Sequence, residues 1–192
     1  MKQPVPTTLV GKHVRLVPLG REHVDDLFEA GQYDEVWTWL PATRPQVRED
    51  TLRHIEEALA STDRIPFAVI VDGRAVGTTS YADIDLSVGG LEIGYTWYTP
   101  SLWATSVNPE CKLLLLGHAF DDLGAERVLL KTDALNTRSQ AAIRKLGASY
   151  DGTLRHSRRR PDGTIRDSAY FSLLATEWPA AREALLARIG PS

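Results

Sequence analysis

The sequence predicts an α/β (α+β) protein, in which a mixed, mostly antiparallel sheet has one parallel βαβ crossover near its centre and helices on both faces. Three observations support this prediction. Aromatic and β-branched residues alternate along Leu91–Tyr98, a marked helix start follows at Asn108, and Arg127–Thr132 again has the composition of a strand. A strand, a helix and a second strand at this spacing form a right-handed parallel crossover. Turn residues elsewhere separate strands that can pair antiparallel.

The elements before the crossover are indicated by alternation and by apolar residues at helical spacing. The turn Asp72-Gly73 is typical of a β-hairpin, and residues 87–90 form a second turn before the crossover begins. The expected elements are a strand over His13–Leu19, helices over 21–30 and Val47–Ala60, and strands over Phe67–Val71 and Ala75–Ile84.

The elements after the crossover are a helix, a hairpin and a final helix. The hairpin is indicated by the turn Pro161-Asp162-Gly163. No interior linker, repeat or low-complexity stretch divides the chain, so we expect a single domain over residues 1–192. The expected elements are a helix from Asn136 to Leu146, strands over Tyr150–Arg160 and Thr164–Leu174, and a last helix that ends at Ile189.

Composition excludes several classes of protein. The chain has 192 residues and a formal net charge of −3, which does not favour nucleic acid as a partner. One cysteine excludes an internal disulfide and a thiolate metal cluster, and the five histidines lack metal-ligand spacing, so we expect no metal. No apolar run is long enough to cross a membrane, and the first residues lack a signal-peptide core. We therefore expect a cytoplasmic protein without a membrane partner.

The helix of the crossover has a start that suits an anion. Asn108 is a favourable N-cap, Pro109 suits the first helical position and Glu110 complements the helix dipole. The free N–H groups of such a start lie at the carboxyl end of a strand, where phosphates bind in many proteins. Lys112 could add a positive charge one turn later. Most helix starts of this kind bind nothing, so the segment alone does not establish a phosphate site.

Three stretches extend the pattern. They are EIGYTWYTPSLWATSVNPECK (92–112), RVLLKTDALNTRSQAAIRKLGASYDGTLR (127–155) and DGTIRDSAYFSLLATEW (162–178). In this order they resemble the GCN5-related N-acetyltransferase (GNAT) family, and within it the ribosomal-protein N-terminal acetyltransferase-like (RimJ/RimL-type) branch. The resemblance extends from about Leu9 to Trp178. It implies the acyl-CoA N-acyltransferase fold, acetyl-CoA as the donor, and direct transfer of the acetyl group to a primary amine.

The loop that binds pyrophosphate in the family differs here. The family pattern is Gln/Arg-x-x-Gly-x-Gly/Ala, and the matching positions are Trp103, Ser106 and Asn108. Backbone amides survive any substitution except proline, so the resemblance still implies a cradle made by the amides of Thr105, Ser106, Val107 and Asn108. Trp97 and Tyr98 lie where the family separates its parallel strands and offers an amide to the oxyanion.

Three polar side chains are candidates for proton transfer or cofactor contact, two of them, Asn136 and Ser139, through the resemblance. Strand alternation puts Leu91, Ile93 and Tyr95 on one face, with Glu92 and Gly94 on the other. Glu92 is the candidate general base, because a carboxylate in a central strand beside the cleft can have a raised pKa. Its alternative is a structural carboxylate. Ser139 is the candidate proton donor to the leaving thiolate, and Asn136 is the candidate contact for the pantetheine arm. The alternative for these two residues is simple helix capping.

The acceptor substrate is the part of the reaction that the sequence defines least. Trp37 and Trp39 are candidate walls of an acceptor pocket, although core packing explains them equally well. The acceptor is either the α-amino group of a protein or peptide, or a small amine, and a homodimer is possible in this family. A second hypothesis, favoured by the altered loop, is a binding or regulatory protein that keeps the fold without catalysis. The arginines of the last hairpin could meet a nucleic acid, an acidic substrate or the nucleotide phosphate of CoA, although a solvated hairpin is the more common role of such a run. They are Arg155, Arg158, Arg159, Arg160 and Arg166.

Overall fold

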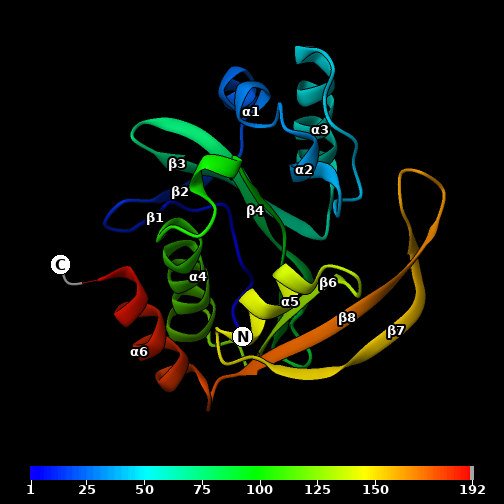
Figure 1. The fold of residues 1–192 in the computed structure, drawn as a ribbon. Helices are drawn as coiled ribbons and strands as arrows, with labels where there is room; N and C mark the ends of the chain where they lie inside the picture. The colour runs from blue at the N-terminus through cyan, green and yellow to red at the C-terminus, as the bar shows by residue number, and fades with distance from the viewer. Residues whose placement is uncertain (191–192) are drawn as a thin grey trace.

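The computed structural model describes residues 1–190 and contains an eight-stranded sheet with helices on both faces (Figure 1). The strand order is β1-β2-β3-β4-β5-β6-β8-β7, and every neighbouring pair is antiparallel except β5 and β6. The strands are β1 (Leu9–Val10), β2 (Arg15–Pro18), β3 (Arg64–Val71), β4 (Arg74–Asp85), β5 (Gly90–Tyr98), β6 (Arg127–Asp133), β7 (Ser149–Arg159) and β8 (Ile165–Leu174).

The helices form two layers, each with its own part of the core. The layer of α1 and α3 packs on β3 and β4, with Leu27, Ile55 and Ala68 in its core. On the other face, α4 packs against α6, and Leu115, Ile143 and Leu185 share a larger core with the sheet. The helices are α1 (Val24–Ala30), α2 (Asp34–Trp37), α3 (Arg48–Ala60), α4 (Val107–Gly117), α5 (Thr137–Arg144) and α6 (Trp178–Ile189). The predicted fold class is confirmed.

Some short elements were not predicted from the sequence. β1, which pairs with β2, lies before the first predicted strand, and α2 lies in the aromatic stretch Tyr33–Leu40, for which no element was predicted. The crossover helix continues past α4 as a π-helical turn, His118–Asp122, in which Leu123 N donates to His118 O at 3.0 Å. It ends before Gly124, whose φ of +70° is one that glycine adopts easily.

The predicted start of the crossover helix is wrong by two residues. Helix α4 begins at Val107, and Ser106 is its N-cap residue, without a side-chain capping bond. Asn108 lies inside the first turn, where its Oδ1 accepts a hydrogen bond from Tyr98 Oη at 3.2 Å. The side chain that favours an N-cap in the sequence is therefore used to tie the helix to the end of β5.

Strand β5 changes character along its length. Its parallel pairing with β6 ends after Glu92, which lies opposite Leu129. Its pairing with β4 then skips a residue at Tyr95, whose φ is +51°. This bulge overturns the expectation that Tyr95 shares a face with Leu91 and Ile93, because an extra residue reverses the alternation beyond it. The bulge and the end of the pairing together open the sheet at this point.

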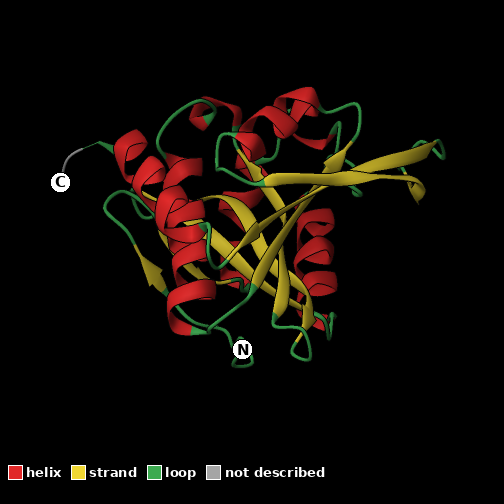
Figure 2. Cartoon of the chain, turned by 90° about the horizontal axis from the view of Figure 1, so that it is seen from below, coloured by secondary structure: helices red, strands yellow, loops and turns green. Residues whose placement is uncertain are grey.

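The β7–β8 hairpin projects from the body of the sheet, and its tip is far from the core (Figures 1 and 2). Its register shifts between Leu154 and Arg158, where His156 has a φ of +53°. This second bulge twists the hairpin, so that Arg158 and Arg166 border the opening beside β5.

Candidate active site

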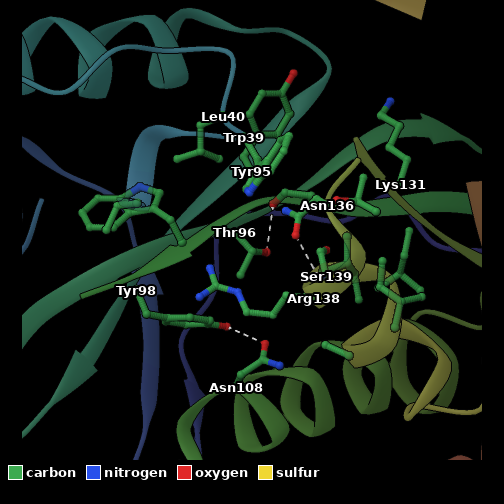
Figure 3. Close-up of a pocket in the computed structure, with 18 of the residues that line it drawn as sticks. Trp39, Leu40, Tyr95, Thr96, Tyr98, Asn108, Lys131, Asn136, Arg138 and Ser139 are labelled. Atoms are coloured by element: carbon green, nitrogen blue, oxygen red, sulfur yellow. Dashed lines mark hydrogen bonds between the residues drawn. The ribbon is translucent and has the colours of Figure 1, made fainter. Parts of the chain in front are cut away.

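A cavity of about 320 Å³ lies where β5 and β6 separate (Figure 3). Its walls come from both strands, the start of α4, the start of α5 and the segment after α2. The carboxyl ends of the separated strands therefore face a space in which an extended ligand can lie between them. The cavity brings together these residues expected from the sequence: Trp39, Glu92, Trp97, Tyr98, Trp103, Asn108, Lys112, Asn136 and Ser139.

Glu92 is buried at the inner end of the opening. Its side chain is 3% exposed, and its Oε2 lies 2.5 Å from Lys131 Nζ. The same ammonium donates to Asp83 Oδ2 at 2.7 Å. Lys131 thus joins a buried carboxylate of β5 to a half-exposed carboxylate of β4, and this connects the inside of the cavity with solvent.

Burial raises the pKa of Glu92 to about 7, although the nearby Lys131 ammonium opposes the rise and Asp83 reinforces it. For Asp83 the Lys131 hydrogen bond dominates, and the pKa of that carboxyl is lowered. The adjacent carboxyl groups of Glu92 and Asp83 therefore differ in proton affinity. Such a difference is typical of sites in which one carboxylate, here Glu92, can take and release a proton near neutral pH.

The backbone leaves space for the Glu92 carboxylate. A Cβ atom built on Gly94 would lie 2.3 Å from Glu92 Oε1. The absence of a side chain at position 94 therefore allows the carboxylate to lie along the strand, on the side of the bulge. Any larger residue there would displace it.

Lys112 extends from the second turn of α4 into the cavity. Its side chain is buried, with a residue exposure of 6%, and its Nζ donates to Thr96 Oγ1 at 3.4 Å. Thr96 Oγ1 also lies 2.8 Å from Thr79 Oγ1. Burial lowers the pKa of Lys112 to about 8, opposed by Cys111 and Glu92. The ammonium thus lies deep in the opening, beside the bulge.

The start of α5 forms the opposite wall. Asn136 caps this helix, because its Oδ1 accepts a hydrogen bond from Ser139 N at 3.0 Å. The capping expected as an alternative is therefore present, and both residues also line the cavity. Figure 3 shows Ser139 and Asn136 facing the opening from α5, while Thr96 faces it from β5.

The loop between β5 and α4 has an ordered backbone without glycine. Ala104 has a φ of +61°, a conformation that glycine adopts more easily. The Thr105 hydroxyl accepts a hydrogen bond from Val107 N at 3.3 Å, so one amide of the expected cradle has an internal partner. The hydroxyl itself donates to Leu102 O at 2.7 Å. Thr105, Ser106 and Val107 lie outside the cavity, at its rim.

Trp103 and Arg138 close the outer part of the opening. The guanidinium of Arg138 lies over the Trp103 ring, 3.8 Å from its centroid, and the Trp103 indole donates to Tyr98 O at 3.0 Å. This contact joins the loop to α5 across the separated strands. Tyr98 itself is buried, and burial raises its pKa well above the ordinary value.

The two tryptophans expected at an acceptor pocket have different positions. Trp39 lines the cavity, near Leu40 (Figure 3). Trp37 packs against Trp97 at 5.4 Å between ring centroids and donates to Gly31 O at 2.7 Å. It lines a second cavity of about 310 Å³, between the sheet and α3. Trp37 therefore packs beside the sheet and does not line the cavity between β5 and β6.

Several residues of the site were missed from the sequence. Lys131 follows simple strand alternation, and nothing local indicates that it faces Glu92. Tyr95 and Thr96 depend on a bulge, and the isolated Gly94 just before it is the signal in the sequence that could have indicated it. Arg138 was visible inside the Asn-x-x-Ser motif, where its charge one residue before Ser139 could have indicated a contact with an anion or a ring.

Two further features bear on the expected ligands. Within residues 1–190, no group of three or more His, Cys, Asp or Glu side chains is placed to hold a metal ion. No helix in the same range is both long and apolar enough to cross a membrane.

Comparison with known proteins places the chain in a family. Residues 13–149 match the family described as "Acetyltransferase (GNAT) domain". YdaF of Bacillus subtilis (strain 168), named as a candidate ribosomal N-acetyltransferase, is 25% identical over 180 residues, which are 90% of this chain and 97% of that protein. The crystal structure of a GCN5-related N-acetyltransferase from Brucella melitensis is 31% identical, with a TM-score of 0.93, over 98% of this chain and 87% of that chain.

A solved structure with a bound CoA derivative shows the same fold. Mycobacterium smegmatis RimJ in complex with CoA-disulfide has a TM-score of 0.82 and 21% identity, over 95% of this chain and 94% of that chain. The resemblance recognised in the sequence is confirmed by these matches. The chain therefore belongs to the GNAT family of N-acetyltransferases.

Proposed function

We propose that this protein transfers the acetyl group of acetyl-CoA to the α-amino group of a protein or peptide. The observation that carries the proposal is the opening between β5 and β6, which has Glu92 on one side and Ser139 on the other. One group can accept a proton and the other can donate one, and both face the same space. Direct transfer from a thioester to an amine requires both proton movements.

The residues present fit acetyl-CoA. The gap between the separated strands has unpaired backbone groups that can bind the amides of an extended pantetheine arm. The rim offers the amides of Thr105, Ser106 and Asn108 at the positive end of the α4 dipole, where a pyrophosphate is favoured. Arg138 lies near this path and adds a guanidinium, a good partner for phosphate. When bound, acetyl-CoA supplies an activated acetyl group and a thiolate leaving group.

Each side chain then has a defined task. Ionised Glu92, with its pKa near neutrality, accepts a proton from the nitrogen of the attacking amine, directly or through a water. Lys131 and Asp83 connect Glu92 to solvent, where the proton can leave. A backbone amide at the bulge, around Tyr95–Trp97, stabilises the oxyanion. Ser139 Oγ donates a proton to the sulfur of CoA as it departs.

The acceptor side favours an extended peptide terminus over a small amine. Trp39 and Leu40 border the cavity from one side, and Arg158 of the projecting hairpin borders it from the other. Between them the mouth is open, so a chain can enter with its first residues while the rest remains outside. The name of YdaF, a candidate ribosomal N-acetyltransferase, agrees with a protein acceptor.

A calorimetric titration with acetyl-CoA, followed by turnover measurements, tests the proposal. We expect micromolar binding, and release of free CoA thiol when short peptides with free N-termini are added. The same peptides with blocked N-termini and an internal lysine are the matched controls. Turnover of polyamines or amino sugars without turnover of peptides would show that the acceptor is a small amine. Absence of binding at millimolar acetyl-CoA would refute the proposed acetyltransferase activity.

One observation favours a second function. The loop lacks the family glycines, and the Val107 amide is already bonded to the Thr105 hydroxyl. Weak cofactor affinity would leave an acetyltransferase-fold protein that binds a partner without catalysis. The same titration separates the two functions, because a binding protein of this kind would show neither saturable acetyl-CoA binding nor thiol release.

A further inference from the structure

Two lysines line the cavity, and their environments are opposite. Lys131 is paired with Glu92 and Asp83, and although burial alone would lower its pKa, these partners raise it above the ordinary value. It therefore stays an ammonium and is not a nucleophile. Lys112 forms no ion pair within residues 1–190, and its Nζ contact is the neutral Thr96 hydroxyl at 3.4 Å.

The surroundings of Lys112 favour the neutral amine. The residue is 6% exposed, and burial lowers its pKa to about 8 against the opposing influence of Cys111 on its own helix and Glu92 on β5. At pH 8 about half of the side chain is then an uncharged primary amine, compared with well under a hundredth of an exposed lysine. A neutral amine is the form that attacks a thioester.

Position adds to this reactivity. Thr96 immediately follows the bulged residue Tyr95, at the point where β5 has separated from β6. Lys112 Nζ therefore lies beside the part of β5 assigned above to the oxyanion. A primary amine held at that place reacts with a bound thioester as an intramolecular partner, with a large advantage over an amine in solution.

We propose that Lys112 is a self-acetylation site, which takes the acetyl group of bound acetyl-CoA when no acceptor is present. Nζ attacks the thioester carbon, the C–S bond breaks, and Nζ loses a proton as the amide forms. The sulfur leaves as CoA thiol after it gains a proton, so one acetyl-CoA is consumed for each chain. The proposal rests on the acetyl-CoA site described under the proposed function.

The modification would regulate the same cavity. An acetyl-lysine carries no charge and is larger than the ammonium, so it would fill space beside Thr96. Turnover of an acceptor should then fall as Lys112 becomes acetylated. An acceptor present from the start competes for the same acetyl group and should protect Lys112.

The experiment compares two acetyl donors on the purified protein without an acceptor. Sites are identified by peptide mass spectrometry after incubation with acetyl-CoA or with acetic anhydride. Acetic anhydride should modify the exposed Lys12 and Lys145 well before the buried Lys112. Acetyl-CoA should reverse this order, with Lys112 modified first, Lys131 unmodified, and a rate that rises with pH through about 8.

Thiol release gives a second readout. The wild-type protein should release up to one CoA per chain in a burst, and Lys112→Arg should abolish that burst while its acetyl-CoA binding, measured by calorimetry, persists. An unmodified Lys112 in protein that binds acetyl-CoA and acetylates a peptide would refute self-acetylation and leave the proposed function intact. Protein that neither binds acetyl-CoA nor becomes modified would refute both.

Discussion

The two halves of β5 have opposite tasks. Over Gly90–Glu92 the strand pairs with β4 on one side and β6 on the other, and Leu91 is 2% exposed in the larger core. The pairing with β6 ends after Glu92, where the cavity begins, and beyond Gly94 the bulge reverses the side chains. The first half holds the fold and the second half forms the site. Glu92 stands at the boundary, with a rigid backbone and a side chain in the opening.

The comparison shows how a site arises from lost pairing. A regular β5 would continue its ladder with β6, and no space would remain for a pantetheine arm. The bulge at Tyr95 requires a left-handed conformation in a residue other than glycine, which costs on the order of 1 kcal/mol or more. The packing of the first half of the strand offsets this cost in free energy. The opening is therefore a property of the backbone of β5.

Removing the carboxylate at the boundary should have the largest effect. Glu92→Gln keeps the shape of the side chain, and we expect kcat to fall by about a hundred-fold or more, since a positioned general base contributes roughly that much. The acceptor used in this assay should be a weakly basic amine, so that its amino group is already unprotonated at every pH measured. Wild-type turnover should then rise with pH through about 7, where Glu92 ionises, and the variant should lose this rise.

Stability gives an independent check on the same carboxylate. A folded-state pKa of about 7, raised from 4.5, means that the folded protein binds a proton that the unfolded chain has already lost. This contribution to stability is present at low pH and is lost as pH rises through 7. The unfolding free energy of Glu92→Gln relative to wild type should therefore increase from pH 5 to pH 8 in denaturant titrations. If Glu92→Gln had the same pH–rate profile and the same pH dependence of stability as wild type, Glu92 would be a structural carboxylate and not the general base.

The proton donor on the far wall should give the next largest effect. Ser139→Ala removes the hydroxyl that faces the opening from α5 but keeps the N–H that Asn136 caps. We expect kcat to fall by about ten- to a hundred-fold, with acetyl-CoA affinity from calorimetry nearly unchanged. Thr137→Ala, at an exposed position of the same helix turn, is the matched control and should change neither value by more than about two-fold. Equal kinetics for both variants would exclude Ser139 as the donor.

The regular half of β5 was predictable from the sequence and the open half was not. Alternation of Leu91 and Ile93 fixed the buried face of the strand, and the turn residues fixed its beginning. Gly94 could have indicated a bulge at Tyr95, but alternation alone does not locate the extra residue, so the expected face of Tyr95 was wrong. The predicted N-cap at Asn108 was also wrong. A tertiary hydrogen bond from Tyr98 uses the side chain that local propensity assigned to the cap.

The candidate site shows the same division. Glu92 was proposed from strand alternation, Asn136 and Ser139 were recognised through a family motif, and the structure brings all three to one cavity. The ion pair of Glu92 with Lys131 depends on the register of two strands far apart in the chain, which one sequence does not reveal. The burial of Lys112 likewise depends on how deeply α4 sits on the sheet, so its chemistry appeared only in three dimensions.

Two glycines of β5 allow the smallest and most selective test of the comparison. A methyl group on Gly94 would lie 2.3 Å from Glu92 Oε1, whereas on Gly90 its nearest neighbour would be Val88 Cγ2, at an ordinary 3.5 Å. Gly94→Ala should therefore push the carboxylate away from its place, and we expect kcat to fall by about ten-fold while acetyl-CoA affinity is retained. Gly90→Ala, in the doubly paired half, should keep kcat within about two-fold and leave stability equal or slightly higher.

Both variants add one methyl group to the same strand, so a general loss of strand stability would affect them alike. Steady-state kinetics, calorimetry with acetyl-CoA and thermal unfolding on the pair separate the possibilities. A fall in kcat confined to Gly94→Ala, with the pH dependence of turnover displaced from that of wild type, would show that the position of the Glu92 carboxylate controls the reaction. If Gly90→Ala lost as much activity as Gly94→Ala, the division of β5 into a structural half and a functional half would be wrong, and the whole strand would have to be treated as one unit.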